Sequence, residues 1–384
     1  MEWTHCKVSD LAEIISGGTP KTSIESYWNG NIPWLSVKDF SGDSKYVSST
    51  EKTITEEGLN HSAANLLDVN DIVISARGTV GELAMLSVPM SLNQSCFGLR
   101  PKCDADYLYY LLKIKVAELK QRANGGVFGT IIRTTFDSIK CTLPLELKDQ
   151  HRIASILSTY DSLIENNTKR IRLLEKMAEN LYKEWFVRFR FPGHEKVEME
   201  NGLPKGWKIK RYEDELNVKY GKGLPTDKLT DKGFPVFGSN GQIGYYTSYM
   251  YEQPQILISC RGASSGVVNI SLPKSFVTNN SLVCEMGDKT ESVFEYLKYY
   301  FLNTNLVQYQ TGSAQPQITI NNIVKLKMLL PSKGIQNKFA EKVRVFDNEM
   351  QILAKQNTLL ARQRDLLLPR LMSGKLEVKE ELLE

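Results

Sequence analysis

Two long stretches of the chain carry apolar residues in alternating steps of four and three. The first runs from Ile153 to Trp185 and the second from Phe339 to Leu371. The first set is Ile153, Leu157, Tyr160, Ile164, Asn167, Ile171, Leu174, Ala178, Leu181 and Trp185, and the second is Phe339, Val343, Phe346, Met350, Leu353, Asn357, Leu360, Arg364, Leu367 and Leu371. These steps average about 3.5 residues, which is the coiled-coil period. We therefore expect two long helices that bury these narrow seams against each other.

The two seams are copies at a constant offset, because every position of the second lies 186 residues after its counterpart in the first. At a rise of about 1.5 Å per residue, each seam is roughly 50 Å long. A paired rod of that length is a spacer. The pattern therefore predicts that the helices hold two other parts of the protein apart.

The segments outside the seams repeat one another in outline. Matching positions are Trp3 and Trp207, Gly18-Thr19-Pro20 and Gly223-Leu224-Pro225, 72–78 and 256–262, 93–95 and 279–281, Tyr107-Leu108 and Tyr296-Leu297, Gly126 and Gly312, and Leu143-Pro144 and Leu330-Pro331. Each copy is predicted to be a mixed domain of short strands, such as 71–75 and 82–86, followed by a helix near 107–121 in the first copy. A repeat of this length predicts duplicated domains.

The predicted fold class is α+β: two similar mixed α/β domains separated by two long antiparallel coiled-coil helices, related as a pseudo-twofold repeat. Proline and glycine at 192–193 end the first helical pattern. The expected boundaries are a first domain at 1–146, a first spacer helix at 147–191, a linker at 192–206, a second domain at 207–332, a second spacer helix at 333–372 and a C-terminal tail at 373–384.

The two copies differ mainly in one interval. About fifty residues separate Pro20 from Asp71, whereas about thirty separate Pro225 from Gln255. Different insertions on a shared frame are the arrangement expected when recognition depends on loops.

Composition excludes several classes of protein. The chain of 384 residues is 41% hydrophobic and 24% charged, which is typical of a globular protein of two or three domains. Lys and Arg exceed Asp and Glu by 48 to 44, which permits a basic face without requiring one. The six cysteines form no CxxC pair, so we expect free thiols in a reducing cytoplasm. The N-terminus carries no apolar signal segment and no long apolar run follows, so we expect neither export nor a membrane span.

Catalytic motifs are missing from the sequence. An amino-methyltransferase needs an F-x-G-x-G loop and a D/N/S-P-P-Y/F tetrad, and Phe237–Gly241 is the nearest approach, with the wrong spacing. The sequence also has no GxxxxGK[ST], HExxH or GxSxG motif. We therefore expect no catalysis by this chain alone and no metal site in it.

Two related domains held apart by a stiff rod suit a long, periodic partner such as double-stranded DNA. A spacing of roughly 50 Å corresponds to about 15 base pairs, so each domain could contact its own short site. Residues present in both copies cannot distinguish two different half-sites. We therefore expect Arg77 and Arg261 to contact phosphates or to shape their turns, and the unmatched residues to read bases.

Candidate DNA contacts mix polar and aromatic groups, as base-edge and backbone contacts require. In the first domain they are Tyr27, Asn29, Asn31, Ser36, Lys38, Arg77, Thr130 and Arg133. In the second they are Lys228, Lys232, Ser239, Asn240, Gln242, Tyr246, Arg261, Gln315 and Gln317. The alternative for each is an ordinary loop or core residue, and Trp34 and Tyr245 are better explained as core. The glycine-rich loops 125–130 and 312–317 serve either DNA contact or a tight turn.

In this order the motifs resemble a known family, the DNA-specificity (S) subunits of type I restriction–modification systems. The resemblance rests on 71–81, on Leu143-Pro144 with Gln150, on 181–187 and on 203–207, and it covers essentially the whole length. One departure is Lys333-Gly334-Ile335-Gln336, which replaces the family's proline-rich lead into the second helix.

The resemblance implies two target-recognition domains, each reading half of a split site, with the gap set by the helices. It also implies docking of two methyltransferase (modification) subunits, which carry S-adenosylmethionine, and recruitment of motor and restriction subunits that use ATP and Mg. The expected docking residues are Arg170, Arg362 and Arg370 on the helices and Trp185, Phe186 and Phe189 after the first helix; for the basic residues the alternative is a solvated face. Rival interpretations are a freestanding sequence-specific DNA-binding protein and an unrecognised hydrolase or transferase.

Overall fold

The computed structural model describes residues 1–40, 44–123, 129–312 and 315–378. The chain divides into two compact units, and each contains part of both long helices. Unit 1 comprises Met1–Lys169 and Leu353–Glu384, and unit 2 comprises Arg170–Ile352.

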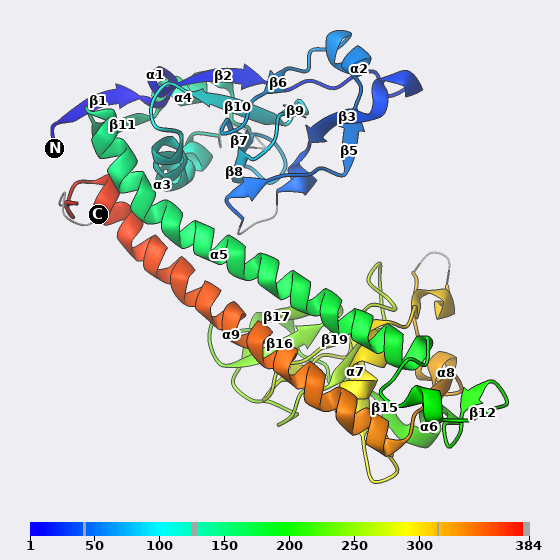
Figure 1. Ribbon diagram of the computed structural model, residues 1–384. Helices are drawn as coiled ribbons and strands as arrows, with labels where there is room; N and C mark the ends of the chain where they lie inside the picture. Colours follow the sequence, from blue (N-terminus) through cyan, green and yellow to red (C-terminus); the bar gives the residue numbers. More distant parts are fainter. Residues whose placement is uncertain (41–43, 124–128, 313–314, 379–384) are drawn as a thin grey trace. The chain divides into compact units, whose positions relative to one another are not determined.

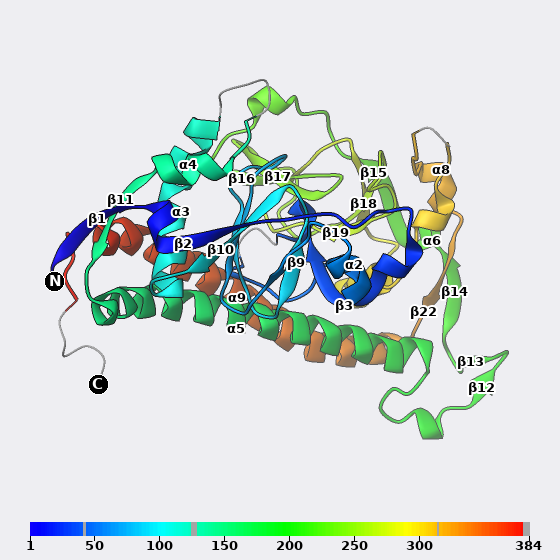
Figure 2. The ribbon, with the colours of Figure 1, turned by 90° about the horizontal axis from the view of Figure 1, so that it is seen from above.

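Unit 1 contains two sheets of four and five strands and a two-stranded ribbon. Its elements are β1 (Trp3–Lys7), α1 (Val8–Leu11), β2 (Ala12–Ser16), η1 (Glu25–Tyr27), β3 (Trp28–Leu35), η2 (Val37–Asp39), β4 (Tyr46–Val47), β5 (Lys52–Ile54), α2 (Glu56–Asn60), β6 (Leu66–Leu67), β7 (Ile72–Ser75), β8 (Leu83–Leu86), β9 (Met90–Leu92), β10 (Cys96–Pro101), α3 (Ala105–Ala123), α4 (Arg133–Ser138), β11 (Lys140–Pro144), the first part of α5 (Leu147–Tyr182) and the last part of α9 (Lys333–Met372). The strand orders are β2-β10-β7-β8-β4, β5-β3-β9-β6 and β1-β11. Figure 2 shows β2 running alongside β10 in this unit.

Unit 2 repeats this plan with shorter connections. Its elements are the end of α5 with the π-helical turn η3 (Lys183–Val187), η4 (His194–Lys196), β12 (Met199–Glu200), β13 (Leu203–Pro204), β14 (Lys208–Arg211), α6 (Tyr212–Glu215), β15 (Leu216–Tyr220), η5 (Thr226–Lys228), β16 (Phe234–Gly238), β17 (Gly241–Tyr246), β18 (Ile256–Ser259), β19 (Val268–Ile270), β20 (Phe276–Val277), β21 (Ser281–Met286), α7 (Phe294–Leu302), η6 (Val307–Tyr309), α8 (Ile320–Ile323), β22 (Lys327–Leu330) and the first part of α9. The strand orders are β15-β21-β18-β19, β17-β16-β20, β14-β22 and β12-β13.

The internal repeat predicted from the sequence is confirmed by this topology. The order β2-β10-β7-β8 in unit 1 has its equivalent in β15-β21-β18-β19 in unit 2, and the ribbon β1-β11 in β14-β22. The parallel pair β3 and β9 likewise corresponds to the parallel pair β16 and β20. Two strands of unit 1 have no strand equivalent in the described part of unit 2: β4, which pairs with the outer edge of β8, and β6, which pairs with β9.

Matching side chains hold the start of each long helix. In unit 1 the Gln150 amide donates to the Pro144 carbonyl (2.9 Å) and accepts from the Asp104 N–H (3.1 Å). In unit 2 Gln336 makes the same pair of bonds, with Pro331 (2.8 Å) and Val293 (2.7 Å). Both glutamines are buried, so each bond replaces water that the helix end has lost.

The two long helices pack antiparallel within each unit, with the green α5 beside the orange-to-red α9 in Figure 1. In unit 1 the Asn167 amide donates to the Asn357 side-chain oxygen (3.0 Å), and Asp161 pairs with Arg364. Every seam position is buried or half-buried, whereas Leu163 and Leu173, which lie off the seam, are 45% and 60% exposed. The seam prediction is therefore confirmed within each unit.

The chain after α5 differs from the expectation for docking residues. The side chains of Trp185 and Phe186 are only 4% and 3% exposed, and they pack in the core of unit 2 against Phe339. Phe189, with a left-handed backbone (φ 57°), contacts Trp207 edge to face. A docking role for Trp185 and Phe186 is therefore wrong in this structure, because their surface is consumed by the domain's own core. The helical segment also ends at Val187, before the proline.

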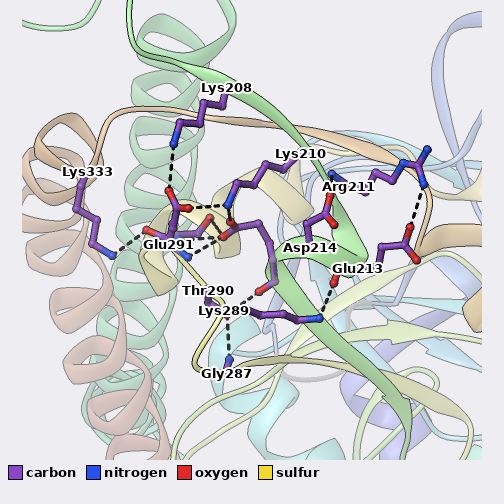
Figure 3. Close-up of polar contacts among 12 residues, drawn as sticks. Lys208, Lys210, Arg211, Glu213, Asp214, Gly287, Lys289, Thr290, Glu291 and Lys333 are labelled. Atoms are coloured by element: carbon purple, nitrogen blue, oxygen red, sulfur yellow. Dashed lines mark hydrogen bonds and ion pairs between the residues drawn. The ribbon is translucent and has the colours of Figure 1, made fainter.

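A buried carboxylate fixes the turn from α6 into β15 in unit 2. Glu215 is fully buried, and its Oε2 accepts from the N–H groups of Glu291 (2.9 Å) and Ser292 (3.1 Å) and from the Ser292 hydroxyl (3.0 Å). Lys210 bridges Glu215 (2.8 Å) and Glu291 (2.7 Å), and Figure 3 shows its ammonium beside Glu291. These carboxylates raise the pKa of Lys210, chiefly through the hydrogen bond to Glu215.

Candidate nucleic-acid interface

A cleft of about 400 Å³ in unit 1 gathers three of the predicted DNA contacts. It is lined by Trp34, Ser36, Val37, Lys38, Glu51, Lys52, Arg77, Gly78, Asn93 and Ser95. Ser36 and Lys38 follow the end of β3, and Arg77 follows the end of β7, so strand ends from both sheets meet here. The structure thus brings together residues that lie some forty positions apart in the chain.

The loop carrying Ser36 and Lys38 is held by Asp39. The Asp39 Oδ2 atom accepts from the Ser36 N–H and hydroxyl, both at 2.7 Å, and its Oδ1 atom accepts from the Glu51 N–H at 2.7 Å. The indole of Trp34 donates to the Gly18 carbonyl (3.0 Å) and is buried. Because these groups fix the backbone, Lys38 can extend to solvent from a rigid base.

The cleft is positively charged. Among the described residues, three cationic side chains, Lys38, Lys52 and Arg77, line it against one carboxylate, that of Glu51. The nearby Asp39 carboxylate is already occupied by three donors. Such an excess of cations suits a phosphate backbone, whereas the neighbouring Asn93, Ser95 and Ser36 offer both donors and acceptors.

The two matched arginines occupy equivalent turns. Gly78 and Gly262, which follow Arg77 and Arg261, have nearly the same left-handed φ, 77° and 76°. The N–H of Ile131 donates to the Ala76 carbonyl (3.0 Å), and that of Ile318 donates to the Cys260 carbonyl (3.0 Å). Both arginines are exposed. The turns are therefore a common feature of the fold, and each one presents a cation to solvent.

Unit 2 also gathers predicted contacts around its arginine. Arg261 forms an isolated β-bridge with Gln317, and the Gly262 N–H donates to the Pro316 carbonyl (3.1 Å). The Ser259 hydroxyl donates to the Ser239 carbonyl, which brings the β16–β17 turn to the end of β18. Ser239, Arg261 and Gln317 thus lie at one place, and Asn240 and Gln315 are the exposed neighbours of Ser239 and Gln317 in the chain.

The remaining predicted contacts lie away from these two clusters. Tyr27 stacks on His61 (5.9 Å between centroids), and Asn29 adopts a left-handed turn (φ 62°) beside it in sequence. Tyr246 is half-buried edge to face against Phe276. Asn31, Arg133, Lys228, Lys232 and Gln242 are exposed, and Thr130 is half-buried next to Ile131. Of the glycine-rich loops, residues 124–128 and 313–314 lie outside the described residues. Tyr245, expected in the core, is 37% exposed.

Sequence reasoning missed three lining residues of the unit 1 cleft as DNA contacts. Lys52 reaches it because β5 pairs with β3 and places Lys52 opposite Trp34. Asn93 and Ser95 come from the connection between β9 and β10, and Asn93 Oδ1 accepts from the Ser95 N–H (3.0 Å). The repeat does mark this connection, whereas nothing in the short Lys52–Ile54 strand predicts its partner.

The helices carry a second apolar row that the seam analysis also missed. On α9, Val345 and Ile352 in unit 2 are seven residues apart and 65% and 51% exposed, and Leu359 and Leu366 in unit 1 are seven residues apart and 59% and 62% exposed. The predicted docking residues Arg362 and Arg370 follow Leu359 and Leu366 by three and four residues, so they share that face. Arg170 pairs with Glu349 (2.6 Å) and stays half-exposed. The seven-residue spacing was available in the sequence.

Three further observations concern what the described residues contain. No group of three or more His, Cys, Asp or Glu is arranged to hold a metal ion within the ranges described. None of the helices in that part of the chain is long and apolar enough to cross a membrane. The six cysteines are free thiols, and Cys6 and Cys141 lie opposite each other on β1 and β11 with their sulfurs 3.3 Å apart.

The protein has two mixed domains of the same topology. Each domain carries a cluster of polar loop residues around an exposed arginine, and this arrangement defines a two-domain binding protein. The family model of the type I restriction modification DNA specificity domain matches the chain twice, over residues 1–176 and 204–362. The chain belongs to this family. The two matches coincide with the two copies of the repeated topology.

Relatives support the same assignment over the whole length. The chain is 29% identical to the type I restriction enzyme MjaIX specificity subunit of Methanocaldococcus jannaschii, covering 99% of this chain and 94% of that protein. It is 24% identical to the EcoprrI specificity subunit of Escherichia coli, covering 86% and 84%. Its fold resembles the crystal structure of a type I restriction-modification S subunit from M. genitalium, with a TM-score of 0.56 at 19% identity over 97% and 96% of the two chains.

Proposed function

We propose that this chain is the DNA-specificity subunit of a type I restriction–modification complex. Each domain reads one half of a bipartite site in double-stranded DNA, and the paired helices set the gap between the halves. The chain itself is not an enzyme and works in the cytoplasm.

One observation carries this proposal: a single family model matches the chain twice, and the two copies share a strand order but carry different inserted elements. In unit 1 the interval before β7 contributes η1, β3, η2, β4, β5, α2 and β6, whereas in unit 2 the interval before β18 contributes η5, β16 and β17. A shared scaffold with different loops is what two unlike half-sites require.

Within each domain the matched and unmatched residues take different roles. Arg77 and Arg261 sit in the same turn in both copies, so they suit the phosphate backbone, which has the same charge everywhere. Ser36 and Lys38 around one arginine, and Ser239, Asn240 and Gln317 around the other, differ between the copies and suit base edges. The positive charge of the unit 1 cleft supports a DNA ligand.

Partner subunits dock on the helices and supply the chemistry. The exposed row on α9, apolar at Leu359 and Leu366 and basic at Arg362 and Arg370, is the kind of surface that a protein partner covers. Two modification subunits carrying S-adenosylmethionine and motor or restriction subunits using ATP and Mg complete the complex. Methylation and cleavage belong to those subunits.

Selection from random duplex DNA tests the recognition role. The chain assembled with its modification subunits should enrich a split motif with a constant unspecified gap. One contiguous motif, or none, would contradict the proposal. Enrichment by the chain without any modification subunit, together with no affinity for one, would instead favour a freestanding DNA-binding protein.

Substitutions separate the two kinds of contact. Arg77→Ala should weaken binding to all sequences about equally and reduce the salt dependence by about one phosphate contact, with the motif unchanged. Lys38→Ala should change the preferred bases in one half only.

Calorimetry on the purified chain should detect no binding of S-adenosylmethionine, and binding would place a methyltransferase site in this chain.

A further inference from the structure

Unit 2 contains a cleft of about 820 Å³. In unit 1 the equivalent place is occupied by a segment of the unit's own chain. The cleft is lined by the β19 edge, the start of α7 and one face of α9, including Ile270, Leu272, Glu295, Lys298, Arg344 and Asp347. The size falls within the range of ligand pockets. Leu272 and Met286 in its wall are 47% and 40% exposed.

The internal repeat identifies what fills the same place in unit 1. There β4 pairs with the outer edge of β8, with the Met85 N–H donating to the Lys45 carbonyl (2.8 Å) and the Ser87 N–H to the Val47 carbonyl (3.1 Å). In unit 2 the strand equivalent to β8 is β19, which lies at the edge of its sheet in the described part of the chain. Its outward backbone groups face the cleft side without a strand on them, and such an edge can accept one.

Lys45 is the anchor of the unit 1 segment. It is 4% exposed, pairs with Asp106, donates to the Ser158 hydroxyl (2.9 Å) and lies over the Tyr110 ring (4.7 Å to the centroid). Alignment of α3 with α7 makes Glu295 the equivalent of Asp106 and Tyr299 that of Tyr110. Unit 2 therefore has the acid and the aromatic ring, and the ammonium of Lys298 on α7 lies over that ring (4.9 Å to the centroid), but its insertion supplies no lysine to Glu295.

The equivalent acid in unit 2 is only half satisfied. Glu295 Oε1 accepts from Arg344 Nε (2.5 Å), but Glu295 Oε2 is buried and has no hydrogen-bond partner among the described residues. The neighbouring Asp347 carboxylate is already paired with Lys298 (2.6 Å) and Tyr299 (2.8 Å). A buried carboxylate oxygen without a donor is costly, so this atom is the natural acceptor for an incoming ammonium group.

Arg344 occupies the approach to this acceptor. It lies at the α9 position equivalent to Ser158 of α5, its side chain is 57% exposed, and Glu295 raises its pKa mainly through their hydrogen bond. Because more than half of the Arg344 side chain is exposed, its pairing with Glu295 contributes little and the side chain can move aside at little cost. Arg344 thus stands in for the missing lysine without filling the cleft.

We propose that this cleft binds an extended segment of a partner protein, which adds a strand to β19 and inserts a lysine against Glu295. The segment resembles Lys45-Tyr46-Val47 of unit 1: a lysine followed by an aromatic and a β-branched residue. The backbone edge supplies affinity, and Glu295 selects the lysine. This site is separate from DNA recognition and does not depend on it.

A peptide probe tests the proposal on the full chain. A labelled peptide with the sequence of residues 44–50, Ser-Lys-Tyr-Val-Ser-Ser-Thr, should bind saturably by fluorescence anisotropy, with a Kd of roughly 1 mM or below. The same peptide with methionine in place of the lysine should bind about tenfold more weakly. Equal binding of the two peptides, or no saturation by roughly 10 mM, would overturn the proposal.

Two variants of the chain give opposite shifts. Glu295→Gln should weaken the lysine peptide about tenfold, whereas Arg344→Ser, which recreates the unit 1 arrangement, should strengthen it several-fold. Lys342→Ser, an exposed change on α9 outside the cleft, is the matched control and should have no effect. If Glu295→Gln and Arg344→Ser change DNA affinity and leave the peptide unaffected, the cleft belongs to the DNA surface and the proposal fails.

Discussion

Removing Arg364 tests whether a buried ion pair holds the two helices together in unit 1. Arg364 and Asp161 are 7% and 5% exposed, and the Tyr110 hydroxyl donates to the same carboxylate. Burial acts to lower the pKa of Arg364, but Asp161 outweighs it and the pKa is raised. Arg364 is therefore charged in the folded state, and Arg364→Ala leaves the buried Asp161 side chain with the neutral Tyr110 hydroxyl as its remaining partner.

The expected cost follows from that orphaned charge. Breaking a buried pair by deleting one partner costs about 3–5 kcal/mol, a large part of a typical domain's stability. Unit 1 comprises roughly 200 residues. For a domain of that size each kcal/mol lowers Tm by about 2–4 °C, so the variant should unfold roughly 6–20 °C lower.

Differential scanning calorimetry on the full chain is the assay, because two units predict two transitions of which one should move. Arg362→Ala, an exposed change two residues away on the same helix, is the control and should shift neither transition by more than about 1 °C. A shift of under about 2 °C for Arg364→Ala, or an equal shift of both transitions, would refute the reasoning.

Three further predictions concern stability, thiol chemistry and spacing. Glu215→Ala leaves two N–H groups, a hydroxyl and Lys210 without their acceptor and should destabilise unit 2 by about 3 kcal/mol in urea unfolding. The control Glu213→Ala changes a half-exposed side chain and should cost about 0.5 kcal/mol or less. Equal effects of the two substitutions would contradict the assignment. Burial raises the pKa of Cys96 and of Cys284 to about 12, so both thiols should resist a thiol reagent at about pH 8 in the folded chain. The thiols of the unfolded chain ionise near pH 9, whereas the buried thiols of the folded chain do not. The stability that these thiols contribute below pH 9 should therefore fall as the pH rises from about 9 to 12. A stability that rises over this pH range would be inconsistent with these shifts. Deleting one matched heptad from both helices removes roughly 10 Å of rise and should shorten the gap between the two DNA half-sites by about three base pairs. An unchanged gap would show that the helices do not set this distance.

The large-scale organisation could be predicted from the sequence because it depends on periodicity and repetition. The four-and-three spacing gave both helices and their shared face, and residue matches such as Ile72 with Ile256 and Tyr107 with Tyr296 gave the repeated topology. The strand at Ile72–Ser75 and the helix at Ala105–Ala123 also lie where the pattern indicated. The spacing and the matches are both visible in the sequence itself, so no knowledge of the tertiary structure was needed.

The predictions that failed concern residues whose surroundings depend on contacts between segments far apart in the chain. Trp185 and Phe186 follow a helix end, which suggested surface, but a π-helical turn and the left-handed Phe189 direct this segment into the unit 2 core. Lys45 gave no sign that it would be buried, because its partners Asp106 and Ser158 are far away in the chain. Lys52 joins the cleft through strand register. Only the folded chain reveals such pairings.

Mapping methylated adenines across the host genome, before and after an exchange of domains, tests the central claim most directly. Residues 1–146 are replaced by the equivalent domain of another family member, and the helices and residues 207–332 are kept. The account predicts a methylated motif altered in one half, with the other half and the gap unchanged. A motif altered in both halves, or in neither, would contradict it.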